Sequence, residues 1–132
     1  MDNTLRPARN GDPATGPVFL VLERDLLVAE DMLGTLRQLG PCRAIHLANP
    51  QALLAYLQDG AHISAAFLEM RLCDLMDSPV LQPLRDRGAR IVLTVGEDDA
   101  ALAEAQGWRM LARPFTDWMI RDILAEPPKA TA

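Results

Sequence analysis

The chain has 132 residues, of which 49% are hydrophobic and 23% are charged, and this balance predicts one globular domain with a buried core. Its net charge of -5 argues against nucleic acid as a partner, because proteins that bind nucleic acid present a basic face. No apolar stretch approaches the roughly 20 residues that cross a bilayer, so we expect no membrane partner either.

The cysteine content and the start of the chain both bear on the cellular compartment. Cys42 and Cys73 are too few for a disulfide framework, so we expect reduced thiols, with a single bridge between them as the alternative. The first residues lack the apolar core of a signal peptide. Together these features predict a cytoplasmic protein.

Short apolar segments alternate with helical patterns along the chain. Strands are expected at about 17–22, 42–47, 64–69, 90–95 and 108–112. Helices are expected at about 25–39, from Pro50 onward, at 79–87, at 98–106 and from Thr116 to 125. Residues 1–16 and 126–132 are predicted to be flexible tails, which leaves 17–125 as the domain.

Two connections carry more detailed predictions. Asn49 is a predicted N-cap, because Pro50 suits the first position of a helix. Cys73, Asp74 and Asp77 are predicted to lie in a loop, where they are only weak evidence for a metal site.

The first helix is expected to turn one apolar side toward the core. This side is formed by Leu26, Ala29, Leu33 and Leu36.

The strand patterns predict an α/β fold with a parallel sheet covered by helices on both faces. The strands at 17–22, 64–69 and 90–95 are almost continuously apolar, as central strands are. The strand at 42–47 alternates polar and apolar residues, as an edge strand does, and 108–112 fits the opposite edge.

Polar side chains follow several of these strands at their carboxyl ends, namely Glu23, Glu69, Thr94 and Arg113. Ligands of open parallel sheets bind outside the carboxyl ends of the strands. The sequence therefore predicts that these side chains converge on one site.

In this order and spacing, the strand ends resemble those of response-regulator receiver domains (CheY-like) over residues 17–125, and Arg113-Pro114-Phe115 is similar to the family's Lys-Pro-Phe. The resemblance implies a flavodoxin-like three-layer αβα sandwich with strand order 2-1-3-4-5. It also implies roles for individual residues. Glu69 occupies the position of the family's phosphoacceptor aspartate, Thr94 that of the switch hydroxyl and Arg113 that of the lysine. Leu22-Glu23 occupies the position of the acidic pair that helps to hold Mg²⁺.

This chain departs from the family pattern at the residues that matter most. Leu22 removes one acid, so at most a weak Mg²⁺ site remains, formed by Glu23, Glu69 and the carbonyl of Arg71. Glu69 is longer than aspartate, which misplaces the nucleophilic oxygen, and its permanent charge partly imitates a phosphoryl group. The planar guanidinium of Arg113 suits a carboxylate, so the sequence predicts a Glu69–Arg113 ion pair.

The resulting hypothesis is an atypical single-domain response regulator, or pseudo-receiver, that is not an enzyme and has no resident cofactor beyond possible weak Mg²⁺. Its expected partners are a histidine kinase, a phosphotransferase or another signalling protein of a two-component or phosphorelay pathway. A second copy could bind the face of helix four, strand five and helix five, where an exposed Trp108 or Trp118 would support binding.

Alternatives to this hypothesis remain open. One is a receiver that is phosphorylated and binds Mg²⁺ weakly. Another is a flavodoxin-like cofactor-binding protein, which the acids of Glu23-Arg24-Asp25 disfavour because amides normally cradle phosphate after the first strand. Glu23 could belong to a surface charge cluster, Thr94 could bond only locally, and Arg113 could be a plain surface cation. His46 and His62 are expected to be ordinary edge or loop residues.

Overall fold

The computed structural model describes residues 16–96, 99–112 and 115–126, so most of both predicted tails lies outside it. One parallel sheet forms the centre, with strand order β2-β1-β3-β4-β5. Its strands are β1 (Val18–Leu22), β2 (Arg43–Leu47), β3 (Ala65–Leu68), β4 (Arg90–Leu93) and β5 (Arg109–Met110). The predicted α/β fold, the strand order and the two edge strands are confirmed.

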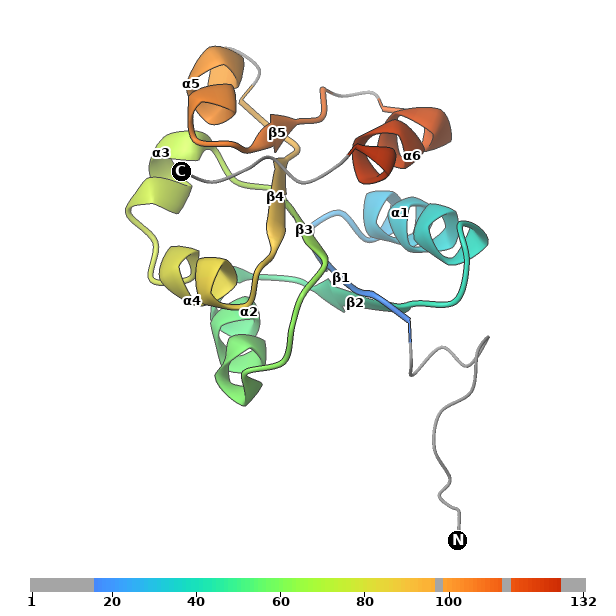
Figure 1. Cartoon of the computed structure of the whole chain (residues 1–132), viewed down its shortest axis with the longest axis horizontal. Coiled ribbons are helices and arrows are strands. Elements are labelled where there is room, and N and C mark those ends of the chain that lie inside the picture. Colours follow the sequence, from blue (N-terminus) through green and yellow to red (C-terminus); the bar gives the residue numbers. More distant parts are fainter. Residues whose placement is uncertain (1–15, 97–98, 113–114, 127–132) are drawn as a thin grey trace, which may run out of the picture.

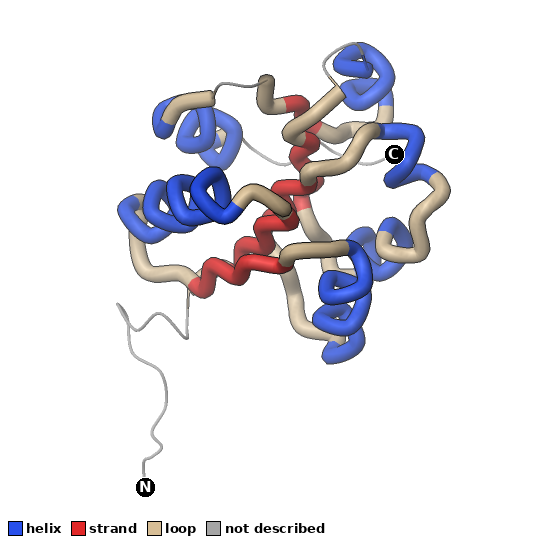
Figure 2. Tube along the Cα trace, turned by 180° about the vertical axis from the view of Figure 1, so that it is seen from behind, coloured by secondary structure: helices blue, strands red, loops and turns tan. Residues whose placement is uncertain are grey.

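Helices cover both faces of the sheet and give the molecule three layers (Figures 1 and 2). They are α1 (Leu26–Gln38), α2 (Pro50–Tyr56), the 3₁₀ turn η1 (Leu57–Asp59), α3 (Leu72–Met76), α4 (Leu81–Asp86), α5 (Ala100–Ala105) and α6 (Asp117–Ala125). Helices α1 and α6 lie on one face, and α2 to α5 lie on the other (Figure 1). Within the described residues, no helix is long and apolar enough to span a membrane.

Because side chains alternate along the strands, each strand contributes side chains to two separate cores, one on each face of the sheet. Phe19 and Val21 of β1 pack under α1 and α6, whereas Leu20 and Leu22 pack under the other helices. Strand β3 is buried on both faces, and Phe67 in its middle has no exposed surface. Full burial of one such side chain contributes about 1.5–3 kcal/mol, so a fully apolar central strand is stable here despite its shortness.

Side-chain caps set the start of two helices. Asp25 precedes α1, and its carboxylate accepts hydrogen bonds from the amides of Leu27 and Val28. Asn49 precedes α2 and accepts from the amide of Ala52 at 2.8 Å, as its place before Pro50 predicted. These caps satisfy amides that have no partner within their own helix.

The predicted loop after the third strand is wrong in part, because α3 contains Cys73 and Asp74. Leu72 and Leu75 are buried on one side of this helix, and three-residue spacing of apolar side chains is what a single helical turn needs. Asp77 directly follows the helix, and its amide donates to the carbonyl of Cys73. Burial of Leu72 and Leu75 in the core therefore accounts for the helix.

The predicted core face of the first helix is wrong at one position. Leu26 is exposed at the start of α1, and Met32 is buried beside the predicted Ala29, Leu33 and Leu36. Helix α1 begins at Leu26, directly after the cap at Asp25, and the neighbouring Leu27 is exposed as well. Neither leucine of the first turn therefore belongs to the core.

Two arginines hold the end of α6 against the sheet. Arg90, the first residue of β4, donates through Nη1 to the carbonyl of Ile123 and through Nη2 to that of Glu126, both at 2.6 Å. Arg109 of β5 forms an ion pair with the Glu126 carboxylate at 2.9 Å. Cations are favourable at a helix C-terminus, where several carbonyls have no partner in the helix.

Both cysteines are free thiols, as expected, but their environments differ. Cys42 is buried, and burial raises the pKa of its thiol, although the nearby charge of Arg37 lowers it. Cys73 is exposed on α3. We therefore expect iodoacetamide to alkylate Cys73 alone in the native protein and both thiols in urea, as counted by intact mass. Rapid double labelling of the native protein would contradict the burial of Cys42.

Candidate functional site

Backbone hydrogen bonds of the sheet position three of the predicted site residues. The amide of Glu23 donates to Leu47, that of Glu69 to Leu22 and that of Thr94 to Leu68, at 3.1, 2.9 and 2.9 Å. Each residue thus continues the parallel ladder one step beyond its strand. Because these bonds are part of the sheet, Glu23, Glu69 and Thr94 lie together at its carboxyl edge.

Arg24 binds the carboxylate of Glu69. The Arg24 amide donates to Oε1 at 2.8 Å, the side-chain Nε donates to the same oxygen at 3.3 Å, and Nη2 donates to Oε2 at 3.2 Å. Both carboxylate oxygens therefore accept hydrogen bonds from one residue. This fork arrangement is the strong form of an arginine–carboxylate contact.

The two partners differ in their exposure to solvent. The Glu69 side chain is 13% exposed, whereas that of Arg24 is 83% exposed. The hydrogen bond to Glu69, and then the charge of Glu69, raises the pKa of the Arg24 guanidinium. The anion is thus held inside the edge of the sheet, and the cation covers it from the solvent side.

Carboxylates occupy the backbone amides of the turn between β1 and α1. Besides the Arg24 amide bound to Glu69, the Asp25 amide donates to Glu23 Oε2 at 3.1 Å. The amides of Leu27 and Val28 donate to Asp25 itself. These are the amides that would cradle a phosphate in a nucleotide or flavin site. The turn therefore opposes phosphate binding through both its negative charge and its occupied donors.

Glu23 is 1% exposed, which is unusual for a carboxylate, and the edge strand helps to hold it. Nε2 of His46 on β2 lies 2.8 Å from the backbone carbonyl of Glu23 and donates to it in the tautomer that carries the proton there. The expectation that His46 is an ordinary edge residue missed this contact. The position of His46 between the apolar Ile45 and Leu47 on β2 was the feature of the sequence that could have predicted it.

The hydroxyl of Thr94 and the side chain of Leu22 face protein and not solvent. Thr94 is 2% exposed, and its Oγ1 donates to the carbonyl of Leu68 at 3.3 Å. Leu22 belongs to the core cluster under α2 and α3. At the position of Leu22, the chain therefore has an apolar side chain packed in the core, where the family pattern has an acid.

A second ion pair joins the loop after β3 to the start of α5. Nη2 of Arg71 lies 3.2 Å from Oδ2 of Asp99, the N-cap residue of α5. Gly96, with φ of 86°, lies under this pair, and a Cβ there would come within 3.1 Å of the same carboxylate oxygen. The glycine is therefore required both for its backbone conformation and for the close approach of Asp99.

The oxygens of the predicted weak Mg²⁺ site already have protein partners among the described residues. No group of three or more His, Cys, Asp and Glu side chains within residues 16–96, 99–112 and 115–126 could hold a metal. Glu69 binds a guanidinium, the side chain of Leu22 supplies no oxygen, and the carbonyl of Arg71 accepts a hydrogen bond from the amide of Leu75 in α3. Mg²⁺ requires oxygen ligands in near-octahedral geometry, and a cation already occupies the Glu69 carboxylate.

Arg113 and Pro114 lie outside the described residues, so the Glu69–Arg113 pair stays a prediction. The structure also shows a contact from Arg24, a residue for which the sequence predicted no role at the site. The feature of the sequence that could have predicted this contact was the position of Arg24, directly after Glu23 at the end of a central strand. The side chain of a residue next to the site can reach the neighbouring strand end.

Comparisons with known proteins show the fold. No family model matches the sequence, and no curated protein matches it significantly. A crystal structure of a response regulator from Thermotoga maritima is similar, with a TM-score of 0.60 and 14% sequence identity. The match covers 84% of this chain and 99% of that one. The chain therefore has the fold of a response-regulator receiver domain.

Proposed function

We propose that this protein is a signalling module with a receiver fold that acts by binding partner proteins and is not switched by phosphorylation at Glu69. The observation that carries the proposal is the contact of Arg24 with both oxygens of the Glu69 carboxylate. A phosphoryl acceptor must present a carboxylate oxygen in line with the incoming phosphorus. Here the oxygens at that position accept hydrogen bonds from a cation of the same chain.

The charge of the site supports the same proposal. A phosphoryl group would bring about -1.5 to -2 charges, which a receiver balances with a metal and a cation. Glu69 supplies one permanent negative charge, and the guanidinium of Arg24 neutralises it at 3.2 Å. The edge of the sheet thus has a built-in ion pair, and we infer that the module stays in one state.

The partners that we propose are a histidine kinase, a phosphotransferase, another signalling protein or a second copy of the chain, in the cytoplasm and without catalysis by this protein. The face of α5, β5 and α6 supports binding of a protein. Trp118 on α6 is 64% exposed and Leu102 on α5 is 60% exposed, whereas Trp108 is buried. Exposed tryptophan is enriched among the residues that contribute most to binding energy at interfaces.

A phosphodonor tests the proposal directly. The protein is incubated with acetyl phosphate and Mg²⁺, and its intact mass is measured with and without donor. We expect no gain in mass, because Arg24 holds the only side chain that stands at the acceptor position of the family pattern. A stable added phosphoryl group on Glu69 would contradict the proposal and favour the phosphorylated receiver instead.

The same samples address the flavodoxin-like alternative. A cofactor-binding protein of that kind would be expected to bind flavin mononucleotide, whose phosphate needs open backbone amides. Because carboxylates occupy the amides of Arg24, Asp25, Leu27 and Val28, we expect no binding when flavin fluorescence is titrated with protein. Saturable quenching would favour this alternative.

A further inference from the structure

Helix α6 begins with a hydrogen bond to a methionine sulfur. The backbone amide of Thr116, the N-cap residue, donates to Sδ of Met119 at 3.4 Å, and the amide of Met119 donates to the carbonyl of Thr116 at 3.1 Å. In a capping box, the residue at the position of Met119 is Glu or Gln, whose side-chain oxygen accepts from the N-cap amide. Here a thioether, which is a weak acceptor, takes the place of that oxygen.

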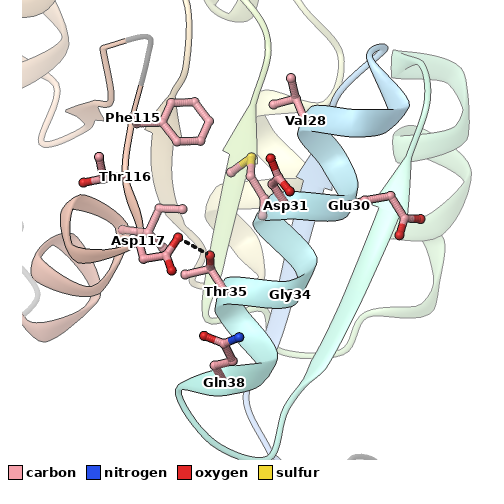
Figure 3. Close-up of a pocket in the computed structure, with 11 residues that line it drawn as sticks. Val28, Glu30, Asp31, Gly34, Thr35, Gln38, Phe115, Thr116 and Asp117 are labelled. Carbon is pink, nitrogen blue, oxygen red and sulfur yellow. Dashed lines mark hydrogen bonds between the residues drawn. The ribbon is translucent and has the colours of Figure 1, made fainter.

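The contact between Thr116 and Met119 lies at the surface of the protein. Thr116 is exposed and Met119 is half-buried. Phe115, Thr116 and Asp117 also line an open groove of about 740 Å³ between α1 and α6 (Figure 3). A small dissolved oxidant can therefore reach this turn, and the thioether sulfur is the atom at which methionine is oxidised.

The side chain of Met119 also has an apolar role. Like Phe115 and Leu124, it packs against the buried core under α1 and α6, which includes Ile120 and Ile123. An unbranched thioether suits such a contact because it adapts its shape to the surrounding side chains. A methionine sulfoxide is polar, and burying its oxygen without a hydrogen-bond donor costs free energy.

Addition of oxygen to Sδ would break the capping contact. An oxygen on the side of Thr116 would have to fit between two atoms that are only 3.4 Å apart, so the amide would move away. An oxygen on any other side would withdraw electrons from the sulfur and make it a poorer acceptor. In both cases the first turn of α6 loses the hydrogen bond that Met119 accepts.

Two neighbours of Met119 would be affected by this loss. Asp117 accepts a hydrogen bond from Thr35 Oγ1 at 2.8 Å, which holds the start of α6 against α1 (Figure 3). Trp118 lies in the same turn and is 64% exposed. A looser first turn would therefore change how firmly Trp118 is held at the surface.

We propose that Met119 is a site of reversible oxidation that controls the order of the first turn of α6. Hydrogen peroxide would transfer one oxygen atom to Sδ, so that an S–O bond forms, the O–O bond breaks and water leaves. The sulfur loses the two electrons that the peroxide gains. An effect on partner binding rests on the proposed function, because Trp118 belongs to the face proposed to bind proteins, whereas the oxidation itself does not.

Peroxide treatment tests the site in a variant that carries Cys73→Ser and Met76→Leu. These changes remove the exposed thiol and the methionine that is 44% exposed on α3. Peptide mass spectrometry measures the oxygen added to Met119, and NMR measures hydrogen exchange of the amides of Met119 and Ile120, which both bond to Thr116. We expect one added oxygen and exchange at least about threefold faster, in the range of a lost cap.

Substitutions of Met119 in the same background supply the controls. Met119→Leu keeps an apolar side chain without an acceptor, so its amides should exchange faster before treatment and should not respond to peroxide. Met119→Gln supplies the oxygen acceptor of a capping box, and we expect slow exchange with and without peroxide. Methionine sulfoxide reductases should return the oxidised parent to its original exchange rates.

Three outcomes would overturn the proposal. Met119 could stay unoxidised under conditions that fully oxidise Met76 in the wild type, its oxidation could leave the exchange rates unchanged, or Met119→Leu could respond to peroxide as its parent does. None of these measurements involves a partner or Glu69. Their failure would therefore leave the proposed function standing, and phosphorylation of Glu69 would not decide the role of Met119.

Discussion

Changing Arg24 to alanine and Glu69 to aspartate together is expected to let the protein bind Mg²⁺ and gain one phosphoryl group from acetyl phosphate. The first change removes the cation that binds both oxygens of residue 69. The second shortens the acid to the length that the family pattern has at this position. With Glu23, the new aspartate would supply two carboxylates, and Mg²⁺ can bind through one or two of them while keeping several waters.

The expected change is large in both measurements. Calorimetric titration should give Mg²⁺ binding at least about tenfold tighter than that of the wild type. Intact mass should increase by one phosphoryl group, as a P–O bond forms on residue 69 and the bond to acetate breaks. Glu69→Asp alone is the matched control, because it changes the acid and leaves Arg24 in place.

A second double variant distinguishes the role of Arg24, whose contact with Glu69 is observed, from that of Arg113, whose contact is predicted. Arg113→Lys with Glu69→Asp restores the family residue at position 113 and keeps Arg24. If only this variant gains phosphate, the predicted Glu69–Arg113 pair is the one that closes the site, and the role assigned to Arg24 is wrong. If only the variant with Arg24→Ala gains it, Arg24 is the closing residue.

Replacing Arg90 with alanine is expected to lower the free energy of unfolding by about 2 kcal/mol. The change removes two hydrogen bonds of 2.6 Å from a charged donor and leaves the carbonyls of Ile123 and Glu126 without it. It also removes a cation from the C-terminus of α6, where the helix dipole favours positive charge. Urea unfolding followed by circular dichroism gives the free energy.

Arg121→Ala is the matched control for this change. It removes the same side chain from an exposed position of α6, and we expect an effect within about 0.5 kcal/mol. Arg90→Lys should recover only part of the stability, because an ammonium cannot reach both carbonyls with a planar fork. Equal effects of Arg90→Ala and Arg121→Ala would show that Arg90 does not anchor the helix in solution.

The sequence predicted the layers and strand order well because they follow from apolar runs that span whole strands. It located Glu23, Glu69 and Thr94 for the same reason, since each continues a strand by one residue. The short helix α3 was missed because its five residues are too few to show a helical repeat, and only Leu72 and Leu75 are buried. Such a helix depends on space in the core, which a sequence does not display.

The contact between Arg24 and Glu69 shows a second limit of sequence-based prediction. Arg24 directly follows a strand end, and residue type alone does not decide whether its side chain reaches the carboxylate at the end of the neighbouring strand. The contact depends on how the turn between β1 and α1 directs its side chains. That turn is held by the carboxylates of Glu23 and Asp25, which accept hydrogen bonds from the amides of Asp25 and Leu27.

The exposure of Arg24 makes the closed edge sensitive to its surroundings. The Arg24 side chain is 83% exposed, and salt weakens ion pairs between exposed groups. Concentrated salt, or an acidic side chain on a bound protein, competes for this guanidinium without any covalent change. We therefore expect the side chain of Arg24 to hold Glu69 less firmly as ionic strength rises, while the Arg24 amide keeps its hydrogen bond to Glu69 Oε1.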